Sequence, residues 1–137
     1  MRGYHMAEHR VSYKIYYEDT DSLGVVYYAN YLKYLERGRT EYVGETSGRD
    51  IRYWNADGYY FVVYAMSIKF RKAAELGDVI DVISTFELPS PYRGVFHQRI
   101  ERGGELVVEA DVEIVCLDKS RAVREFPDLS RSVDFNG

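Results

Sequence analysis

Two carboxylates set two positions apart, Asp19 and Asp21, are the residues of this sequence best suited to chemistry. They lie in the acidic segment 18–21, directly ahead of a stretch whose spacing predicts a helix. Unpaired backbone N–H groups at a helix N-terminus can polarise a carbonyl, and a neighbouring carboxylate can act as a base or nucleophile. Carboxylates at this position also cap helices and turns. The segment therefore predicts either a catalytic carboxylate beside oxyanion donors or a structural cap.

The histidines and the single cysteine indicate structure rather than catalysis. His97 lies far from His5 and His9 in the sequence, and no spacing of Cys, His and carboxylates resembles a zinc site, so we expect no metal. His97 shares a strand face with Val95 and Arg99, which predicts a solvated or hydrogen-bonded histidine. Cys116 alternates with core residues of a strand and is predicted to be an inert, buried thiol.

A strand, a turn and a helix must position the two carboxylates. Residues 10–17 alternate apolar and more polar side chains, the pattern of a half-buried strand, and 18–24 has the composition of a turn. Apolar residues then recur at steps of three and four, which predicts a helix of about four turns. Asn30 is its expected N-cap, and Gly44 and Gly48 are stop signals near its end. Gly38 lies within the apolar stripe, which predicts the close approach of another backbone.

The remainder of the chain reads as strands. The ranges 60–70, 79–88, 93–101 and 105–117 alternate with period two, and Gly103-Gly104 predicts a two-residue hairpin turn between the last two. The order of a strand, a helix and four strands joined by short turns predicts an α+β domain, in which a mostly antiparallel five-stranded sheet has a single helix on one face.

Apolar residues on both faces of two strands predict that a partner covers the second face of the sheet. Besides the residues expected in the core, ranges 60–70 and 105–117 carry a second apolar set: Phe61, Val63, Ala65, Val107 and Val115.

Length and composition restrict the class of protein. The 137 residues fit one domain, for which we expect residues 9–130, with 1–8 as a disordered N-terminus or a cloning remnant and 131–137 as a C-terminal tail. A net charge of −4 lacks the basic footprint of non-specific nucleic-acid binding. No apolar run is long enough to span a bilayer. The lone Cys116 cannot form an intramolecular disulfide, which favours a reducing compartment, and we expect the protein in the cytoplasm.

Three stretches resemble one known family. Residues 17–31 (YEDTDSLGVVYYANY) resemble the signature of the 4-hydroxybenzoyl-CoA thioesterase family, and more narrowly the acyl-CoA thioesterases encoded beside the bacterial Tol-Pal envelope system. Residues 34–41 (YLERGRTE) are similar to the family's helix, and 69–78 (KFRKAAELGD) to its turn between two strands. The resemblance implies the hotdog fold, in which the sheet wraps around one long central helix.

The resemblance also implies catalytic roles. Asp21 aligns with the catalytic carboxylate of the family, and the backbone N–H of Tyr28 with the donor to the thioester carbonyl. Many members of the narrower branch have His where this chain has Tyr28, whereas the hydroxybenzoyl enzymes have Tyr. A backbone donor does not depend on that side chain, so we expect a carboxylate mechanism in which Asp21 is either the nucleophile or a general base that activates water.

Residues for substrate binding follow from the same resemblance. Around the predicted turn and the helix start, the candidates are Gly24, Val26, Tyr27 and Tyr31. As tyrosines near the helix start, Tyr27 and Tyr31 are either core or interface residues or line an acyl pocket. Around the later strand and turn the resemblance implicates Lys69, Arg71 and Lys72 as contacts to CoA. Arg121 and Arg124 are further basic candidates. By default, basic side chains such as these are solvated surface residues.

The predicted function is hydrolysis of acyl-CoA to a free acid and CoA, without a cofactor. The resemblance implies a homotetramer, a dimer of dimers, with catalytic sites at subunit interfaces, and either CoA or acyl carrier protein can present the acyl group. A dehydratase of the same fold would need a catalytic His near the helix start, and residues 18–50 contain none. The alternative from another class is a non-catalytic protein that binds acyl-CoA or acyl carrier protein as a scaffold.

Overall fold

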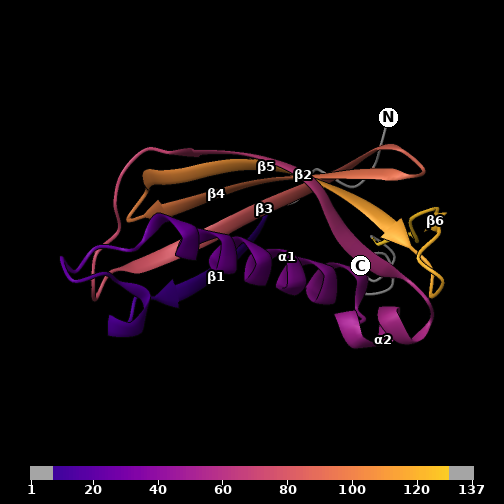
Figure 1. Cartoon of the computed structure of the whole chain (residues 1–137), viewed down its shortest axis with the longest axis horizontal. Helices are drawn as coiled ribbons and strands as arrows, with labels where there is room; N and C mark the ends of the chain where they lie inside the picture. Colours follow the sequence, from indigo (N-terminus) through magenta and orange to yellow (C-terminus); the bar gives the residue numbers. More distant parts are fainter. Residues whose placement is uncertain (1–7, 130–137) are drawn as a thin grey trace.

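The computed structural model describes residues 8–129. One antiparallel sheet carries a long helix against one of its faces (Figure 1). The predicted C-terminal tail, and the predicted N-terminal segment apart from Glu8, lie outside the described residues.

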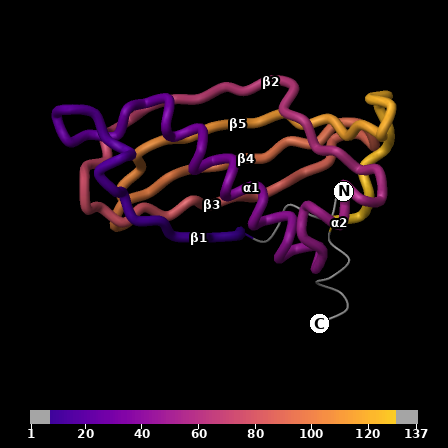
Figure 2. The backbone as a smooth tube through the Cα atoms, turned by 60° about the horizontal axis from the view of Figure 1, so that its bottom comes forward, coloured from indigo at the N-terminus to yellow at the C-terminus, as the bar shows by residue number. Residues whose placement is uncertain are grey.

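Five long strands form the sheet, as predicted. They are β1 (His9–Lys14), β2 (Tyr60–Phe70), β3 (Val79–Ser90), β4 (Arg93–Arg102) and β5 (Glu105–Leu117), in the order β1-β3-β4-β5-β2. Figure 2 shows β1 and β2 at opposite edges, with α1 running obliquely along the sheet between them. A short strand that was not predicted, β6 (Val123–Arg124), pairs with β5. The first strand is shorter than expected because residues 17–19 form a 3-10 turn, η1 (Tyr17–Asp19).

The glycine pair between β4 and β5 forms the predicted two-residue hairpin. Arg102 pairs with Glu105 across the turn, and both Gly103 and Gly104 have positive φ, at 57° and 83°. These values suit a type I′ turn, whose twist matches that of the flanking strands.

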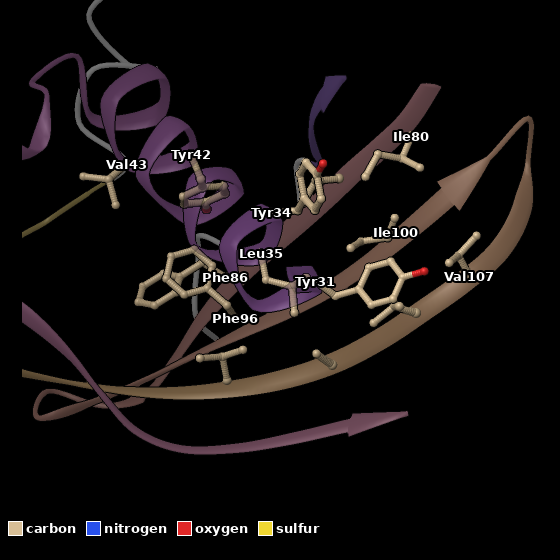
Figure 3. Packing of buried hydrophobic residues seen from close by; sticks show 14 of the residues in the cluster. Tyr31, Tyr34, Leu35, Tyr42, Val43, Ile80, Phe86, Phe96, Ile100 and Val107 are labelled. Atoms are coloured by element: carbon tan, nitrogen blue, oxygen red, sulfur yellow. The ribbon is translucent and has the colours of Figure 1, made fainter. Parts of the chain in front are cut away.

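The long helix, α1 (Tyr31–Ser47), follows a 3-10 turn, η2 (Tyr28–Asn30), and precedes a short helix that was not predicted, α2 (Ile51–Ala56). The apolar stripe of α1 packs on the sheet as its spacing predicted (Figure 3). Gly48 ends α1 with φ at 77°, a conformation that glycine adopts without strain. Asn30 is the N-cap residue of α1, as predicted, but its side chain caps no helical N–H and instead donates to the Asp19 carbonyl at 2.9 Å.

Gly38 marks a close approach, as predicted, although to side chains rather than to another backbone. A Cβ at this position would lie 2.5 Å from Val82 Cγ1 and 3.2 Å from Gln98 Nε2. The missing side chain therefore lets α1 lie close against β3 and β4.

The prediction of an apolar second face was wrong for Phe61 and Val107. A β-bulge between Val63 and Ala65 shifts the alternation of β2, so that Phe61 packs against the same core as Met66 and Ile68, and Val107 is itself buried in that core. This bulge explains the position of Phe61, because an extra residue reverses the inward and outward positions of a strand. A separate register shift, where β4 pairs with β5 between Ile100 and Glu101, leaves Val107 unpaired and explains its position.

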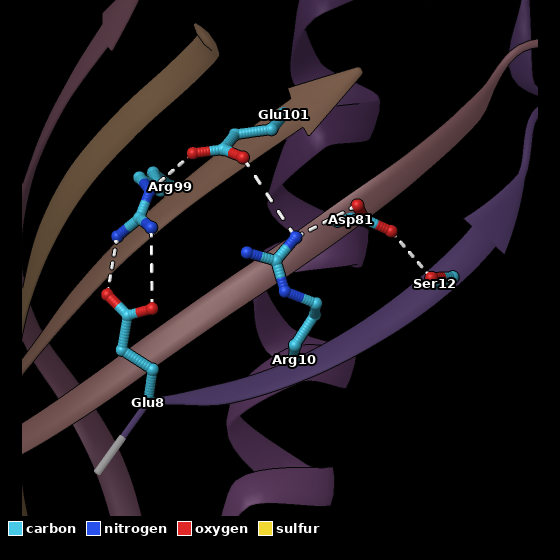
Figure 4. A network of polar contacts seen from close by, with 6 residues as sticks. All are labelled: Glu8, Arg10, Ser12, Asp81, Arg99 and Glu101. Atoms are coloured by element: carbon cyan, nitrogen blue, oxygen red, sulfur yellow. Dashed lines mark hydrogen bonds and ion pairs between the residues drawn. The ribbon is translucent and has the colours of Figure 1, made fainter. Parts of the chain in front are cut away.

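Charged side chains cover the face of β1, β3 and β4 that points away from α1. Figure 4 shows them in front of the strands, with the helix behind. Arg99 contacts Glu101 at 2.6 Å and Glu8 at 3.0 Å, while Arg10 contacts Asp81 at 3.0 Å. Exposed apolar side chains gather instead on the edge strand β2: Val62, Val63, Tyr64 and Phe70.

His97 on β4 is hydrogen-bonded, as predicted, and its position makes the stability of the fold depend on pH. Its ring nitrogens lie 2.6 Å from Asp111 Oδ1 and 2.8 Å from Glu87 Oε2. Burial alone would lower the pKa of His97, but the two carboxylates outweigh burial and raise it. The protonated ring is therefore held more tightly in the folded chain than in the unfolded one.

We expect the stability that His97 contributes to be complete below the unfolded pKa of about 6.5 and to be lost as pH rises through the folded pKa. Urea unfolding of the wild type and His97→Gln across this range measures it. The wild type should be the more stable at acidic pH, and the difference should shrink as pH rises. A difference that does not change with pH would contradict the role given to the charged ring.

Candidate functional site

A tight loop presents Asp21. Thr20 and Val26 form an isolated antiparallel bridge, the Asp21 N–H donates to the Val25 carbonyl at 2.9 Å, and the Gly24 N–H donates to the Asp21 carbonyl at 3.0 Å. Gly24 completes the turn with φ at 80°, where a side chain would be strained. We call residues 20–26 the Asp21 loop.

The Asp21 side chain is exposed and uses only one of its two oxygens. Oδ1 accepts a hydrogen bond from the Leu23 N–H at 2.8 Å, which caps the turn. Oδ2 has no hydrogen-bond partner within residues 8–129. The predicted cap and a carboxylate oxygen available for chemistry therefore coexist in one residue.

Asp19 has a structural position. It is 4% exposed, accepts a hydrogen bond from the Tyr16 N–H at 2.9 Å and lies 3.4 Å from Lys33 Nζ. Burial alone would raise the pKa of Asp19, but these contacts outweigh it and hold the pKa below its usual range. The buried Tyr34 ring lies next to this carboxylate, and burial together with that negative charge raises the pKa of Tyr34. Asp19 thus stays charged and anchors the loop, and Asp21 is the carboxylate left facing solvent.

Tyr28 stands at the start of the helical segment that leads into α1. It is the first residue of η2, and its backbone N–H meets no acceptor in the described part of the chain. Such an N–H, with the helix dipole behind it, favours an oxyanion. The bond from Asn30 Nδ2 to the Asp19 carbonyl ties this helix start to the segment that carries Asp21.

Aromatic rings surround the helix start. Tyr27 and Tyr28 are more than half exposed and lie 5.1 Å apart between ring centroids, and Tyr28 meets Phe70 at 5.6 Å. Phe70, at the end of β2, also lies 5.9 Å from Tyr31. It was not predicted as a site residue, although it belongs to the family-like stretch 69–78. Val26 and Tyr31 are buried, so within one chain they support the loop and the helix start from beneath.

A turn on a distant part of the chain supports the Asp21 loop. The Val26 N–H donates to the Ala74 carbonyl and the Leu76 N–H to the Gly24 carbonyl, both at 2.9 Å. Figures 1 and 2 show the loop before α1 and the segment between β2 and β3 at the same end of the molecule. The turn within the stretch 69–78 therefore holds the Asp21 loop in place.

The predicted basic residues differ in their partners. Arg71 pairs with Glu109 and Lys72 with Glu105, at 2.5 and 3.2 Å, whereas Lys69 is exposed and forms no ion pair within residues 8–129. Arg124 stacks on Tyr59 and donates to the Gly58 carbonyl, so it has a structural position. Lys69 is the member of the predicted set whose charge is available to an anion.

A cavity of 480 Å³ lies along α1 on its β2 side, and sequence reasoning did not predict it. The polar side chains at its wall are Glu36, Arg39 and Thr40. The remaining lining is apolar and comes from α1, α2, the sheet and the C-terminal segment: Val43, Ile51, Phe61, Val62, Val63, Phe86, Phe96, Ile114, Phe126 and Leu129. Its size suits a small apolar group.

Cys116 is fully buried, as predicted, and burial raises the pKa of its thiol to about 11, so it remains protonated at neutral pH. Within residues 8–129, no cluster of three or more His, Cys, Asp or Glu side chains is arranged to hold a metal ion. In the same range, no helix is both long enough and apolar enough to cross a membrane.

Comparisons with known proteins agree on one family. The profile of the thioesterase-like superfamily matches residues 16–133. The acyl-CoA thioesterase YbgC of Haemophilus influenzae is 34% identical over 105 residues, which cover 77% of each chain. The acyl-CoA thioester hydrolase YbgC of Escherichia coli O6:H1 is 35% identical over 106 residues, covering 77% of this chain and 78% of its own. Among solved structures, a probable thioesterase from Bartonella henselae superposes with a TM-score of 0.83 at 32% identity, over 88% of this chain and all of its own.

Proposed function

This chain belongs to the thioesterase-like superfamily, as its sequence predicted, and on that basis we propose that it is an acyl-CoA thioesterase that hydrolyses acyl-CoA to a free acid and CoA. The observation that carries this proposal is the Asp21 loop beside the start of α1, where a free carboxylate oxygen accompanies an unpaired N–H at Tyr28.

In the proposed reaction, the Tyr28 N–H donates a hydrogen bond to the thioester carbonyl oxygen and stabilises the negative charge that develops there. Asp21 Oδ2 either attacks the thioester carbon, to give an acyl-aspartyl anhydride that water then hydrolyses, or removes a proton from the water that attacks. The CoA thiolate leaves in both versions. The reaction needs water and the thioester, and no cofactor takes part.

The residues around the site support hydrolysis over the alternatives. Residues 18–50 hold no His for dehydratase chemistry. A scaffold protein that only binds acyl groups would have no need for an exposed carboxylate beside an unpaired N–H, yet the chain keeps both. We propose that Tyr27 and the aromatic residues next to it contact the acyl group, and that Lys69 contacts a CoA phosphate, with Arg71 and Lys72 beside it.

Hydrolysis of a panel of acyl-CoA thioesters tests the function. Released thiol should be detected with at least one of the short aliphatic, long aliphatic or aromatic acyl groups, and the preferred member identifies the acyl class. The same acyl group on pantetheine and on acyl carrier protein identifies the carrier. A folded wild type that releases no thiol from any of them would favour the scaffold alternative. CoA thioesters and the lone thiol are both consistent with a cytoplasmic location.

We further propose that the protein is a homotetramer, a dimer of dimers, in which the catalytic sites lie at subunit interfaces. The edge strand β2 supports this, because its outer side pairs with no strand in the described chain and its Val63 and Tyr64 side chains are 43% and 70% exposed. A second copy pairing antiparallel with β2 would continue the sheet and cover these side chains. Light scattering should give the mass of four chains, and a monomer at micromolar concentration would contradict the proposal.

A further inference from the structure

We propose that Tyr31 is a positioning residue for the reaction, acting through its hydroxyl rather than by contact with substrate. The hydroxyl ties the start of α1 to residues 73–78, which we call the anchor turn and on which the Asp21 loop rests. This inference rests on the proposed function, because it concerns how the carboxylate of Asp21 is held relative to the N–H of Tyr28.

The Tyr31 hydroxyl has a specific backbone partner. It accepts a hydrogen bond from the Ala74 N–H at 2.9 Å, in a place where Tyr31 is 2% exposed and Ala74 is fully buried. Figure 3 shows Tyr31 projecting from the first turn of α1 with its hydroxyl directed away from the helix. A buried N–H without an acceptor is costly, so the hydroxyl is needed here as well as the ring.

Ala74 connects the helix start to the Asp21 loop through one peptide backbone. Its N–H donates to Tyr31 Oη, and its carbonyl accepts from the Val26 N–H, both at 2.9 Å. The loop makes a second bond to the anchor turn, from the Leu76 N–H to the Gly24 carbonyl. A shift of the anchor turn relative to α1 would therefore move the Asp21 loop relative to Tyr28.

Other contacts make the anchor turn rigid. Arg102 Nη1 donates to the Ala73 carbonyl and to Asp78 Oδ2, each at 2.9 Å. Asp78 Oδ2 also accepts from the Glu75 N–H at 2.8 Å, and the Asp78 carbonyl accepts from the Ile15 N–H at 2.8 Å. These contacts fix the anchor turn against β4 and the end of β1. The bond from the Ala74 N–H to the Tyr31 hydroxyl then connects the anchor turn to α1.

Tyr31→Phe tests the proposal, because it removes the acceptor and keeps the ring. Catalysis is sensitive to small errors in position, so we expect kcat to fall between about 10- and 100-fold while KM changes by less than about 2-fold. Tyr42→Phe is the matched control, since it removes a buried hydroxyl from the same helix about three turns further along and should leave kcat unchanged. An unchanged kcat in Tyr31→Phe, or an equal loss in Tyr42→Phe, would overturn the proposal.

Two readouts separate positioning from a general loss of structure. Amide hydrogen exchange should become faster at Val26 and Leu76 in Tyr31→Phe and stay unchanged in Tyr42→Phe. In an Asp21→Asn background, Tyr31→Phe should have no further effect on the residual rate, because its role acts through Asp21. Unchanged exchange at Val26 and Leu76, or fully additive losses of rate, would refute the role of Tyr31.

If the wild type hydrolyses no thioester, the proposed function fails, and hydrogen exchange alone then decides whether Tyr31 anchors the loop.

Discussion

Replacing Asp21 with Asn should lower kcat/KM for acyl-CoA hydrolysis by on the order of 10³-fold in a protein that remains folded. The Asp21 side chain is exposed, and its Oδ1 accepts a hydrogen bond from the Leu23 N–H. The Oδ1 atom of an Asn side chain can accept the same hydrogen bond from the Leu23 N–H, so the turn keeps its cap. It removes the negative charge from Oδ2, so the site loses its nucleophile or base and retains its shape.

Glu18→Gln is the matched control for this prediction. Glu18 is an exposed carboxylate in the same segment, so its replacement removes an equal charge close by while Asp21 stays intact. Its kcat/KM should remain within about 2-fold of the wild type, as for most exposed substitutions away from the reacting groups. Thiol release and circular dichroism on all three proteins separate loss of chemistry from loss of structure. Equal losses in the two variants would mean that net charge, and not Asp21, controls the rate.

The largest loss of stability is expected from Gly38→Ala. The added Cβ would lie 2.5 Å from Val82 Cγ1, and Val82 is fully buried. The helix must then move away from β3, or Val82 must leave its rotamer. Overpacking of this kind costs about 1–3 kcal/mol in the free energy of unfolding, even though Ala favours a helix more than Gly does.

Gly44→Ala in the same helix is the control for crowding. Its Cβ would lie 3.8 Å from Asp50 Cα, an ordinary van der Waals contact. No steric clash then offsets the higher helix propensity of Ala. We expect the free energy of unfolding to be unchanged or to rise by up to about 1 kcal/mol. Urea unfolding of both variants measures the difference. A Gly38→Ala protein as stable as Gly44→Ala would show that α1 and β3 have room to separate.

Much of the fold could be predicted from the sequence because its elements are strongly periodic. The strands 60–70 and 105–117 have the predicted bounds, and the stripe of α1 faces the core. The bulge between Val63 and Ala65 was not predictable, because a continuous apolar run does not show where the alternation shifts. The partner of the Asn30 side chain was not predictable either, since the Asp19 carbonyl lies outside the helix and eleven positions earlier.

The candidate site could be predicted only as far as local pattern and family resemblance reach. The segment containing Asp19 and Asp21 was identified, but burial alone distinguishes the anchored Asp19 from the exposed Asp21. The anchor turn lies far from the Asp21 loop in sequence, so no local pattern connects Ala74 to Val26 or Tyr31. The cavity beside α1 likewise depends on how distant elements pack.

The most direct test of the proposed function is the time course of thiol and free acid released from an acyl-CoA by the purified wild type, run beside Asp21→Asn. The wild type should release thiol and acid in equal amounts over many turnovers, and Asp21→Asn should release both on the order of 10³-fold more slowly. The same rate from both folded proteins would exclude Asp21 as the catalytic carboxylate, and no release by a folded wild type would contradict the assignment as a thioesterase.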